Sequence, residues 1–154
     1  MIQADFILRH ARQLMSCAGP APRRGALQAD ATAIADGALA SLEGRVVYAG
    51  PDAELDAQVT PLHDARIVDA SEMSIVPGFV DAHTHAAFAG DRREELRRRL
   101  AGATYAQIAA EGGGIVSTVV ATRQAPEEEL IAETWPRLDE MLACGTTTCE
   151  IKSG

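Results

Sequence analysis

The feature that most constrains this chain is a short apolar strand that ends in two histidines, within residues 77–85 (Pro-Gly-Phe-Val-Asp-Ala-His-Thr-His). In an extended chain, residues i and i+2 point to the same face. His83 and His85 can therefore direct both imidazoles at one point in space. Imidazole binds zinc and iron, and a catalytic metal site typically uses three protein ligands plus a water. The pattern predicts part of a metal site, although the spacing alone also fits a pair of surface histidines.

The residues around the histidine pair predict a strand, helix and strand in succession. Residues 75–80 are almost wholly apolar, as expected for a strand buried on both faces of a parallel sheet. A helix is expected from Pro126 to Gly145, with a core-packing face that includes Trp135. The β-branched segment 146–151 then predicts a second strand. This order is typical of a βαβ unit with a right-handed crossover.

Two shorter helices are expected between these strands. Residues 91–100 predict a charged helix, and Thr104 with Gln107 has the spacing of a capping box that starts the next helix. Two i,i+4 ion pairs are expected on the first helix: Glu94 with Arg98, and Glu95 with Arg99. Residues 112–114, three glycines, end the second helix. They lack the Lys-Ser/Thr continuation of a phosphate loop, so a flexible or tightly packed loop is predicted.

Residues 1–75 predict a separate β-rich domain. Glu43-Gly44 is expected to be the turn of a hairpin, and Asp52 to cap a short helix over residues 52–58. Strands are expected at residues 6–8, 12–16, 37–42, 45–49 and 65–69. Short strands with glycine turns indicate a small sheet, or half of a sandwich, packed beside something larger.

Charge and cysteine usage exclude several classes of partner. The net charge of -8 argues against nucleic acid and against an anionic membrane surface. No apolar run has the length of a membrane-spanning helix, and the N-terminus lacks a signal-peptide pattern. Cys17, Cys144 and Cys149 show no disulfide framework, so they are interpreted as free thiols in a reducing compartment, by default the cytoplasm.

Several motifs carry a resemblance to a known family. Residues 76–85 resemble the first barrel strand of the metal-dependent amidohydrolases, in which both histidines bind the metal. Further blocks resemble imidazolonepropionases within that superfamily: Gly90-Asp91-Arg92 and residues 99–105, 112–119, 121–123 and 150–154. The arginine block and the triple glycine are what single out this family.

The resemblance implies an α/β fold in which a small β-sandwich-like domain, residues 1–75, precedes the start of a (β/α)8 TIM-type barrel, residues 76–154. A complete barrel takes about 250 residues, more than the 154 residues of the whole chain, so the barrel is expected to be incomplete. The chain is then an N-terminal portion, inactive and poorly stable alone, since its barrel strands lack neighbours. The remaining metal ligands, a histidine and an aspartate, and the acid/base residues are expected beyond Gly154.

The resemblance also implies an activity, the hydrolysis of a ring C–N bond of 4-imidazolone-5-propanoate to give N-formimino-L-glutamate. His83 and His85 would hold one zinc or iron ion that lowers the pKa of bound water and so supplies a hydroxide. Arg92 would clamp the substrate propionate through two parallel hydrogen bonds, and Tyr105 would add a phenolic hydrogen bond nearby. The family tends to pair, which implies a homodimer.

Alternatives to each of these roles stay open. An ion pair with Asp91 or Glu95 would account for Arg92, and core packing for Tyr105. Another amidohydrolase, such as a guanine or cytosine deaminase or a dihydroorotase-like hydrolase, is the alternative enzyme. A non-catalytic truncated module is the alternative from a different class.

Overall fold

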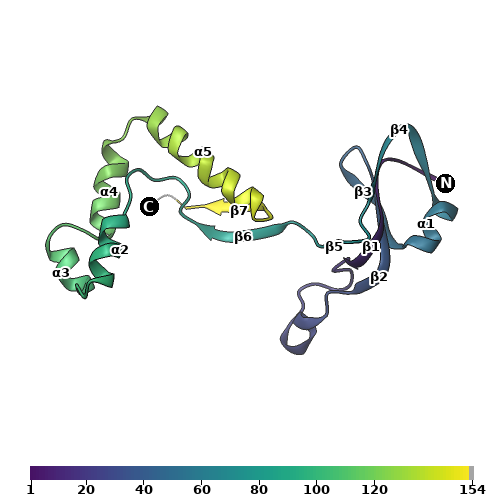
Figure 1. Ribbon diagram of the computed structural model, residues 1–154, viewed down its shortest axis with the longest axis horizontal. Helices are drawn as coiled ribbons and strands as arrows, with labels where there is room; N and C mark the ends of the chain where they lie inside the picture. Colours follow the sequence, from purple (N-terminus) through teal and green to yellow (C-terminus); the bar gives the residue numbers. More distant parts are fainter. Residues whose placement is uncertain (153–154) are drawn as a thin grey trace. The chain divides into compact units, whose positions relative to one another are not determined.

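The computed structural model describes residues 1–152, and the chain divides into two compact units, Met1–Pro77 and Gly78–Gly154. The first unit is mostly strand and the second mostly helix (Figure 1). Among the helices of the described residues, none combines the length and the hydropathy that a membrane crossing requires.

The first unit is built on a five-stranded sheet in which β3, β2, β1 and β4 lie in that order and β5 also pairs with β1. Its elements are β1 (Ile2–Met15), the 3-10 turn η1 (Gly25–Ala29), β2 (Ala33–Leu42), β3 (Arg45–Pro51), α1 (Asp52–Gln58), β4 (Val59–Asp69) and β5 (Ser74–Ile75). The predicted hairpin is confirmed, because β2 and β3 are antiparallel and Glu43 and Gly44 both have positive φ, of 51° and 74°. β4 and β5 run parallel to β1.

The core of this unit lies where α1 packs on the sheet. Small side chains of β1 and β2 leave room for the larger ones that α1, β1 and β3 contribute. The buried cluster consists of Ala4, Ile7, Ala38, Ala40, Tyr48, Leu55 and Val59. The phenol of Tyr48 satisfies its hydroxyl by donating to the Pro51 carbonyl at 2.6 Å.

Asp52 does not cap α1, and the sequence-based prediction of a cap is wrong. Pro51 occupies the N-cap position, and the Asp52 carboxylate turns instead to β1. There it accepts hydrogen bonds from the Arg9 guanidinium, at 2.8 and 3.1 Å, and from the backbone N–H of His10 at 3.1 Å. Asp52 is 4% exposed, so a charged partner is needed to offset its desolvation. The ion pair therefore joins α1 to β1.

Asp52→Asn is expected to lower the free energy of unfolding of the first unit by about 2 kcal/mol at neutral pH, because Arg9 loses its buried partner. Asp56→Asn is the matched control. Its carboxylate also contacts Arg9 but is 76% exposed, so a change of at most about 0.5 kcal/mol is expected. Urea unfolding of the two variants measures the difference.

The Asp52 effect is also expected to depend on pH. The hydrogen bonds from Arg9 hold the pKa of Asp52 below its ordinary value. A carboxylate whose pKa is lower in the folded state stabilises fully above the unfolded pKa, about 3.9, and loses this contribution as the pH falls through the folded pKa. The difference between wild type and Asp52→Asn should therefore be constant near neutrality and shrink in acid. A difference that persists undiminished in acid would contradict this assignment.

The second unit confirms the predicted strand, helices and parallel strand. It contains β6 (Phe79–Thr84), α2 (Arg93–Leu100), α3 (Tyr105–Ala110), α4 (Ile115–Gln124), α5 (Glu127–Ala143) and β7 (Thr146–Ile151). β6 and β7 pair in parallel. Gly145, with a φ of 96°, ends α5 and leads directly into β7.

The apolar segment 75–80 is not the single buried strand that the sequence predicts. Ser74–Ile75 pairs with β1 in the first unit, and β6 begins only at Phe79. Phe79 and Val80 are 56% and 70% exposed. Within the described residues β6 has one neighbouring strand, β7, so its other edge and part of its faces stay open.

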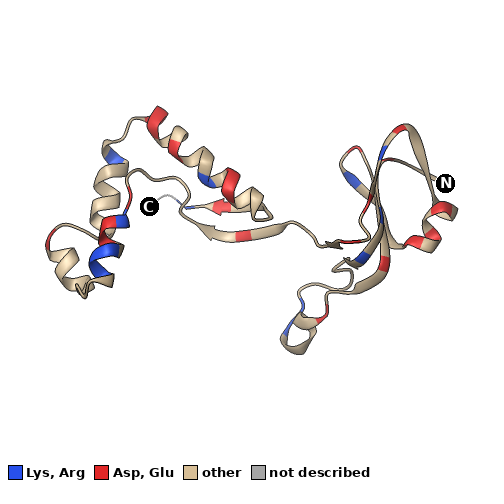
Figure 2. Ribbon diagram, in the orientation of Figure 1, with Lys and Arg blue, Asp and Glu red and all other residues tan. Residues whose placement is uncertain are grey.

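The expected i,i+4 ion pairs on α2 are also wrong. This helix carries charges of both signs, with its two glutamates in the first turn and three arginines in the last (Figure 2). The acidic side chains pair instead with arginines three positions away, Glu94 with Arg97 and Glu95 with Arg92. Arg98 reaches across to Glu111 at the end of α3. The reason is that Glu95 turns toward the triple glycine, which leaves it out of reach of Arg99.

Candidate metal and substrate site

The two histidines project from the carboxyl end of β6, and their ring centroids lie 5.5 Å apart with an angle of 60° between the ring planes. Thr84, between them, is held on the side of β7, where its hydroxyl donates to the Glu150 carbonyl at 2.7 Å. Its own carbonyl accepts from the Lys152 backbone N–H at 2.9 Å. Tethering the middle residue in this way fixes the strand end from which both imidazoles project.

This arrangement fits two ligands of one metal ion. Imidazole nitrogens bind zinc at about 2.0–2.1 Å, so two rings on one tetrahedral ion have centroids roughly 5 Å apart. The observed 5.5 Å is close to this separation, and both residues are exposed, so an ion can reach them. Across residues 1–152 there is no group of three or more His, Cys, Asp or Glu side chains that could hold an ion. The histidine pair can therefore offer at most two clustered ligands among these residues.

A cavity of about 400 Å³ lies beside His85. It is walled mostly by apolar groups of α4 and of the loop over residues 86–90, and it has Arg92 at its rim. The lining residues are His85, Ala87, Phe88, Asp91, Arg92, Ile115, Thr118, Val119 and Thr122. A candidate metal ligand and a guanidinium therefore share one mostly apolar pocket. Tyr105 is not among the lining residues.

The Arg92 guanidinium is held by Glu95. Oε2 of Glu95 accepts a hydrogen bond from Nε of Arg92 at 2.7 Å and also lies 2.7 Å from Nη2, which raises the pKa of Arg92 and lowers that of Glu95. These two donors form one edge of the planar guanidinium. The other edge, Nη1 with Nη2, is the one that a second carboxylate could engage with two parallel hydrogen bonds.

The triple glycine completes the support of Glu95. Oε1 of Glu95 accepts from the Gly114 backbone N–H at 2.7 Å. A Cβ at Gly113 would lie 2.6 Å from the Ile108 side chain and 3.0 Å from this same carboxylate oxygen, so only glycine allows the close approach. Tyr105 lies over the same loop, with its hydroxyl 3.2 Å from where a Cβ of Gly114 would be. Of the two predicted alternatives, a flexible or a tightly packed loop, the structure shows the tightly packed one, which supports the Glu95 carboxylate.

The structure gives two further residues a place in this region. The ion pair of Glu95 with Arg92, left open as an alternative by the sequence, is present, whereas the sequence assigns Arg137 no role. Both are separated in sequence from the backbone they contact, by 19 residues for Glu95 and by 49 and 51 for Arg137. The acidic residue three positions after Arg92 is the one sequence signal that points to Glu95. Ser153 and Gly154 of the 150–154 motif lie outside the described residues.

The fold belongs to a known class. The chain resembles the crystal structure of an adenosine deaminase from Xanthomonas campestris with bound zinc, with a TM-score of 0.59 and 20% identity over 99% of this chain and 29% of that one. This likeness concerns the fold alone, a mixed α/β arrangement. No protein-family model matches the chain.

Sequence comparison finds relatives that are up to about half identical to this chain. The chain is 49% identical over its full length to an imidazolonepropionase of Symbiobacterium thermophilum, 47% to one of Herpetosiphon aurantiacus and 43% to one of Chloroflexus aggregans. The resemblance to imidazolonepropionases is thus confirmed along the whole chain. The chain spans 35–36% of the length of these relatives.

Proposed function

We propose that this chain supplies the metal-binding strand and the carboxylate-binding arginine of an imidazolonepropionase, which hydrolyses a ring C–N bond of 4-imidazolone-5-propanoate to give N-formimino-L-glutamate. The observation that carries the proposal is that His85 and Arg92 line one cavity in a chain that resembles imidazolonepropionases from end to end. A substrate with a hydrolysable ring at one end and a propionate at the other needs both groups within one pocket.

In this proposal, His83 and His85 hold one zinc or iron ion, which supplies a hydroxide near neutral pH by lowering the pKa of coordinated water. The bound zinc of the deaminase with a similar fold supports zinc, and imidazole accepts either metal. The two imidazoles hold the ion at the end of β6, next to the apolar wall of α4. That wall excludes water and strengthens the electrostatic interactions within the cavity.

Arg92 binds the propionate in this proposal. Glu95 engages Nε and Nη2 and so leaves the Nη1–Nη2 edge to the substrate, an edge that can donate two parallel hydrogen bonds to a carboxylate. The pairing with Glu95 thus does not compete with substrate binding but sets its direction. Tyr105, whose exposed ring lies near the same loop, would add a hydrogen bond from its hydroxyl in this proposal.

The wider architecture follows from the same proposal. Residues 1–75 form the small β-sandwich-like domain, and residues 76–154 the first strands and helices of the (β/α)8 barrel. A homodimer and a cytoplasmic location complete the proposal.

A chimera tests the proposed function. Residues 1–154 of this chain would replace the matching residues of the Symbiobacterium thermophilum imidazolonepropionase, and the purified, zinc-loaded protein would be assayed. The chimera is expected to hydrolyse 4-imidazolone-5-propanoate within about tenfold of the parent, and to leave adenosine, guanine, cytosine and dihydroorotate unchanged. His85→Ala in the same chimera serves as the inactive control.

A cooperatively folded, metal-loaded chimera that turns over a purine or pyrimidine instead of the imidazolone would assign the chain to another amidohydrolase. A folded, metal-loaded chimera with no turnover of any of these substrates would favour the non-catalytic alternative.

A further inference from the structure

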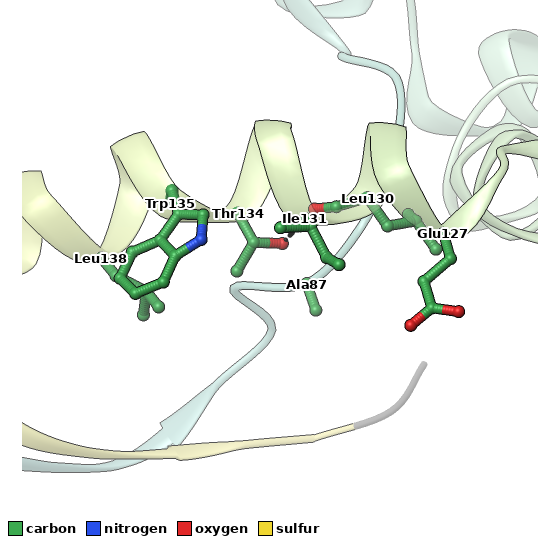
Figure 3. Close-up of a pocket in the computed structure, with 7 residues that line it drawn as sticks. All are labelled: Ala87, Glu127, Leu130, Ile131, Thr134, Trp135 and Leu138. Atoms are coloured by element: carbon green, nitrogen blue, oxygen red, sulfur yellow. Dashed lines mark hydrogen bonds between the residues drawn. The ribbon is translucent and has the colours of Figure 1, made fainter.

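The loop over residues 86–90 connects the two parts of the candidate site, since it begins directly after His85 and leads to Arg92. Ala86 and Ala89 are buried, whereas Ala87, between them, is exposed. Ala87 lies beneath the apolar face of α5, beside Leu130, Ile131 and Trp135, in a groove with about 260 Å³ of open space (Figure 3). Packing at Ala87 is therefore too loose to fix the loop.

Polar contacts from α5 hold the loop instead. Nη1 of Arg137 donates to the carbonyls of Ala86, at 3.0 Å, and of Phe88, at 2.7 Å. The guanidinium also stacks over the Phe88 ring, with its carbon 3.7 Å from the ring centroid. Glu133, one turn earlier on α5, accepts from Nη2 at 3.0 Å and orients the group.

The opposite side of the loop is tied to α4. The Ala89 backbone N–H donates to the Thr122 hydroxyl at 3.2 Å, and Ala89 is buried. Gly90 has a φ of 76°, and a Cβ there would lie 3.1 Å from that of Ala121. The loop is thus held between α4 and α5, with Arg137 supplying the α5 side.

We infer that Arg137 is a positioning residue that fixes this loop and, through it, the imidazole of His85 and the approach to Arg92. The inference rests on the proposed function for its metal-binding consequence, but the restraint on the loop stands on the contacts alone. Arg137 holds the carbonyl of Ala86, the residue that directly follows His85 in the chain. Loss of Arg137 would therefore loosen the backbone next to the residue that carries the imidazole. Groups that orient metal ligands typically change affinity by about 10–100-fold when removed.

The test uses the 154-residue chain with zinc ion as the probe and amide hydrogen exchange as a second readout. Arg137→Met is expected to weaken zinc binding about tenfold and to speed exchange of the Ala89 amide at least about tenfold. The Cys144 amide, which donates to Glu140 at the end of α5, should keep its exchange rate. Arg97→Met is the matched control, since Arg97 is exposed and contacts only Glu94 among the described residues, and it should change neither readout.

Two conservative variants cover the case in which Arg137→Met does not fold. Arg137→Lys keeps the positive charge but removes the planar guanidinium that lies over Phe88 and pairs with Glu133, and Phe88→Leu removes the ring but keeps the carbonyls. Each is expected to give an intermediate loss in both readouts, with α5 intact.

The outcomes separate the two proposals. Zinc affinity within twofold of wild type and an unchanged Ala89 amide in folded Arg137 variants would overturn the positioning role. If His83→Ala and His85→Ala leave zinc binding unchanged, the proposed metal site fails, and the Ala89 amide still decides the role of Arg137.

Discussion

Replacement of His83 or His85 by alanine is expected to lower the zinc affinity of the chain at least about a hundredfold, the largest effect of any single change discussed for it. Each imidazole supplies a metal–nitrogen bond, and the described residues provide no third clustered His, Cys, Asp or Glu to replace it. Removing one of two ligands leaves an ion bound by a single side chain. Isothermal titration of the purified chain with zinc measures the affinity.

His63→Ala is the matched control for these variants. His63 is an exposed histidine on β4, in the first unit, and its loss should not change the affinity. Equal zinc affinity in wild type and in both single variants would refute the ligand assignment. Equal losses in the His63 variant would show that zinc binds the surface histidines without distinction.

Replacement of Arg92 by methionine in the chimera is expected to lower kcat/KM for 4-imidazolone-5-propanoate about a hundredfold. Truncating one partner of a hydrogen-bonded charge pair costs about 2–5 kcal/mol, and a hundredfold corresponds to roughly 2.7 kcal/mol. The propionate does not react, so the loss should fall mainly on KM. Arg92→Lys keeps a positive charge but lacks the two-donor edge, so its kcat/KM should be about tenfold higher than that of Arg92→Met.

Two controls make the Arg92 prediction specific. Arg93→Met removes a neighbouring guanidinium that is 87% exposed and pairs with Asp91, and it should leave the kinetics unchanged. An imidazolone ring without the propionate should be a poor substrate for wild type and no poorer for Arg92→Met. A loss of the same size with both substrates would mean that Arg92 supports the fold through Glu95 and does not bind the carboxylate.

Local sequence patterns predict those parts of this fold that depend on residues close together in the sequence. The capping box forms as expected, since the Gln107 backbone N–H donates to the Thr104 hydroxyl and the Gln107 side chain accepts from the Thr104 backbone. The β2–β3 hairpin and the parallel pairing of β6 with β7 depend likewise on turn residues, β-branched runs and glycine stops. The spacing of His83 and His85 gives their proximity, and their role as ligands remains a prediction.

Local sequence patterns do not predict contacts between residues that are distant in sequence. Arg9 lies 43 residues from Asp52 in the sequence. No local signal marks this pair, so the sequence predicts for Asp52 only a local role, the cap of the adjacent helix. Helix α4 is also absent from the sequence-based account. Its first turns, rich in Ile, Val and Thr, have weak helix propensity, so the local sequence does not mark it as a helix.

The most direct test of the central claim is zinc K-edge X-ray absorption on the zinc-loaded chain. Two imidazoles at about 2.0 Å, with oxygen neighbours completing the coordination, are the predicted result. Sulfur at about 2.3 Å is the contrary signature, which is relevant because Cys144 and His85 line the same cavity of about 440 Å³. A sulfur-dominated spectrum, or one with fewer than two imidazoles, would contradict the claim that His83 and His85 bind one ion.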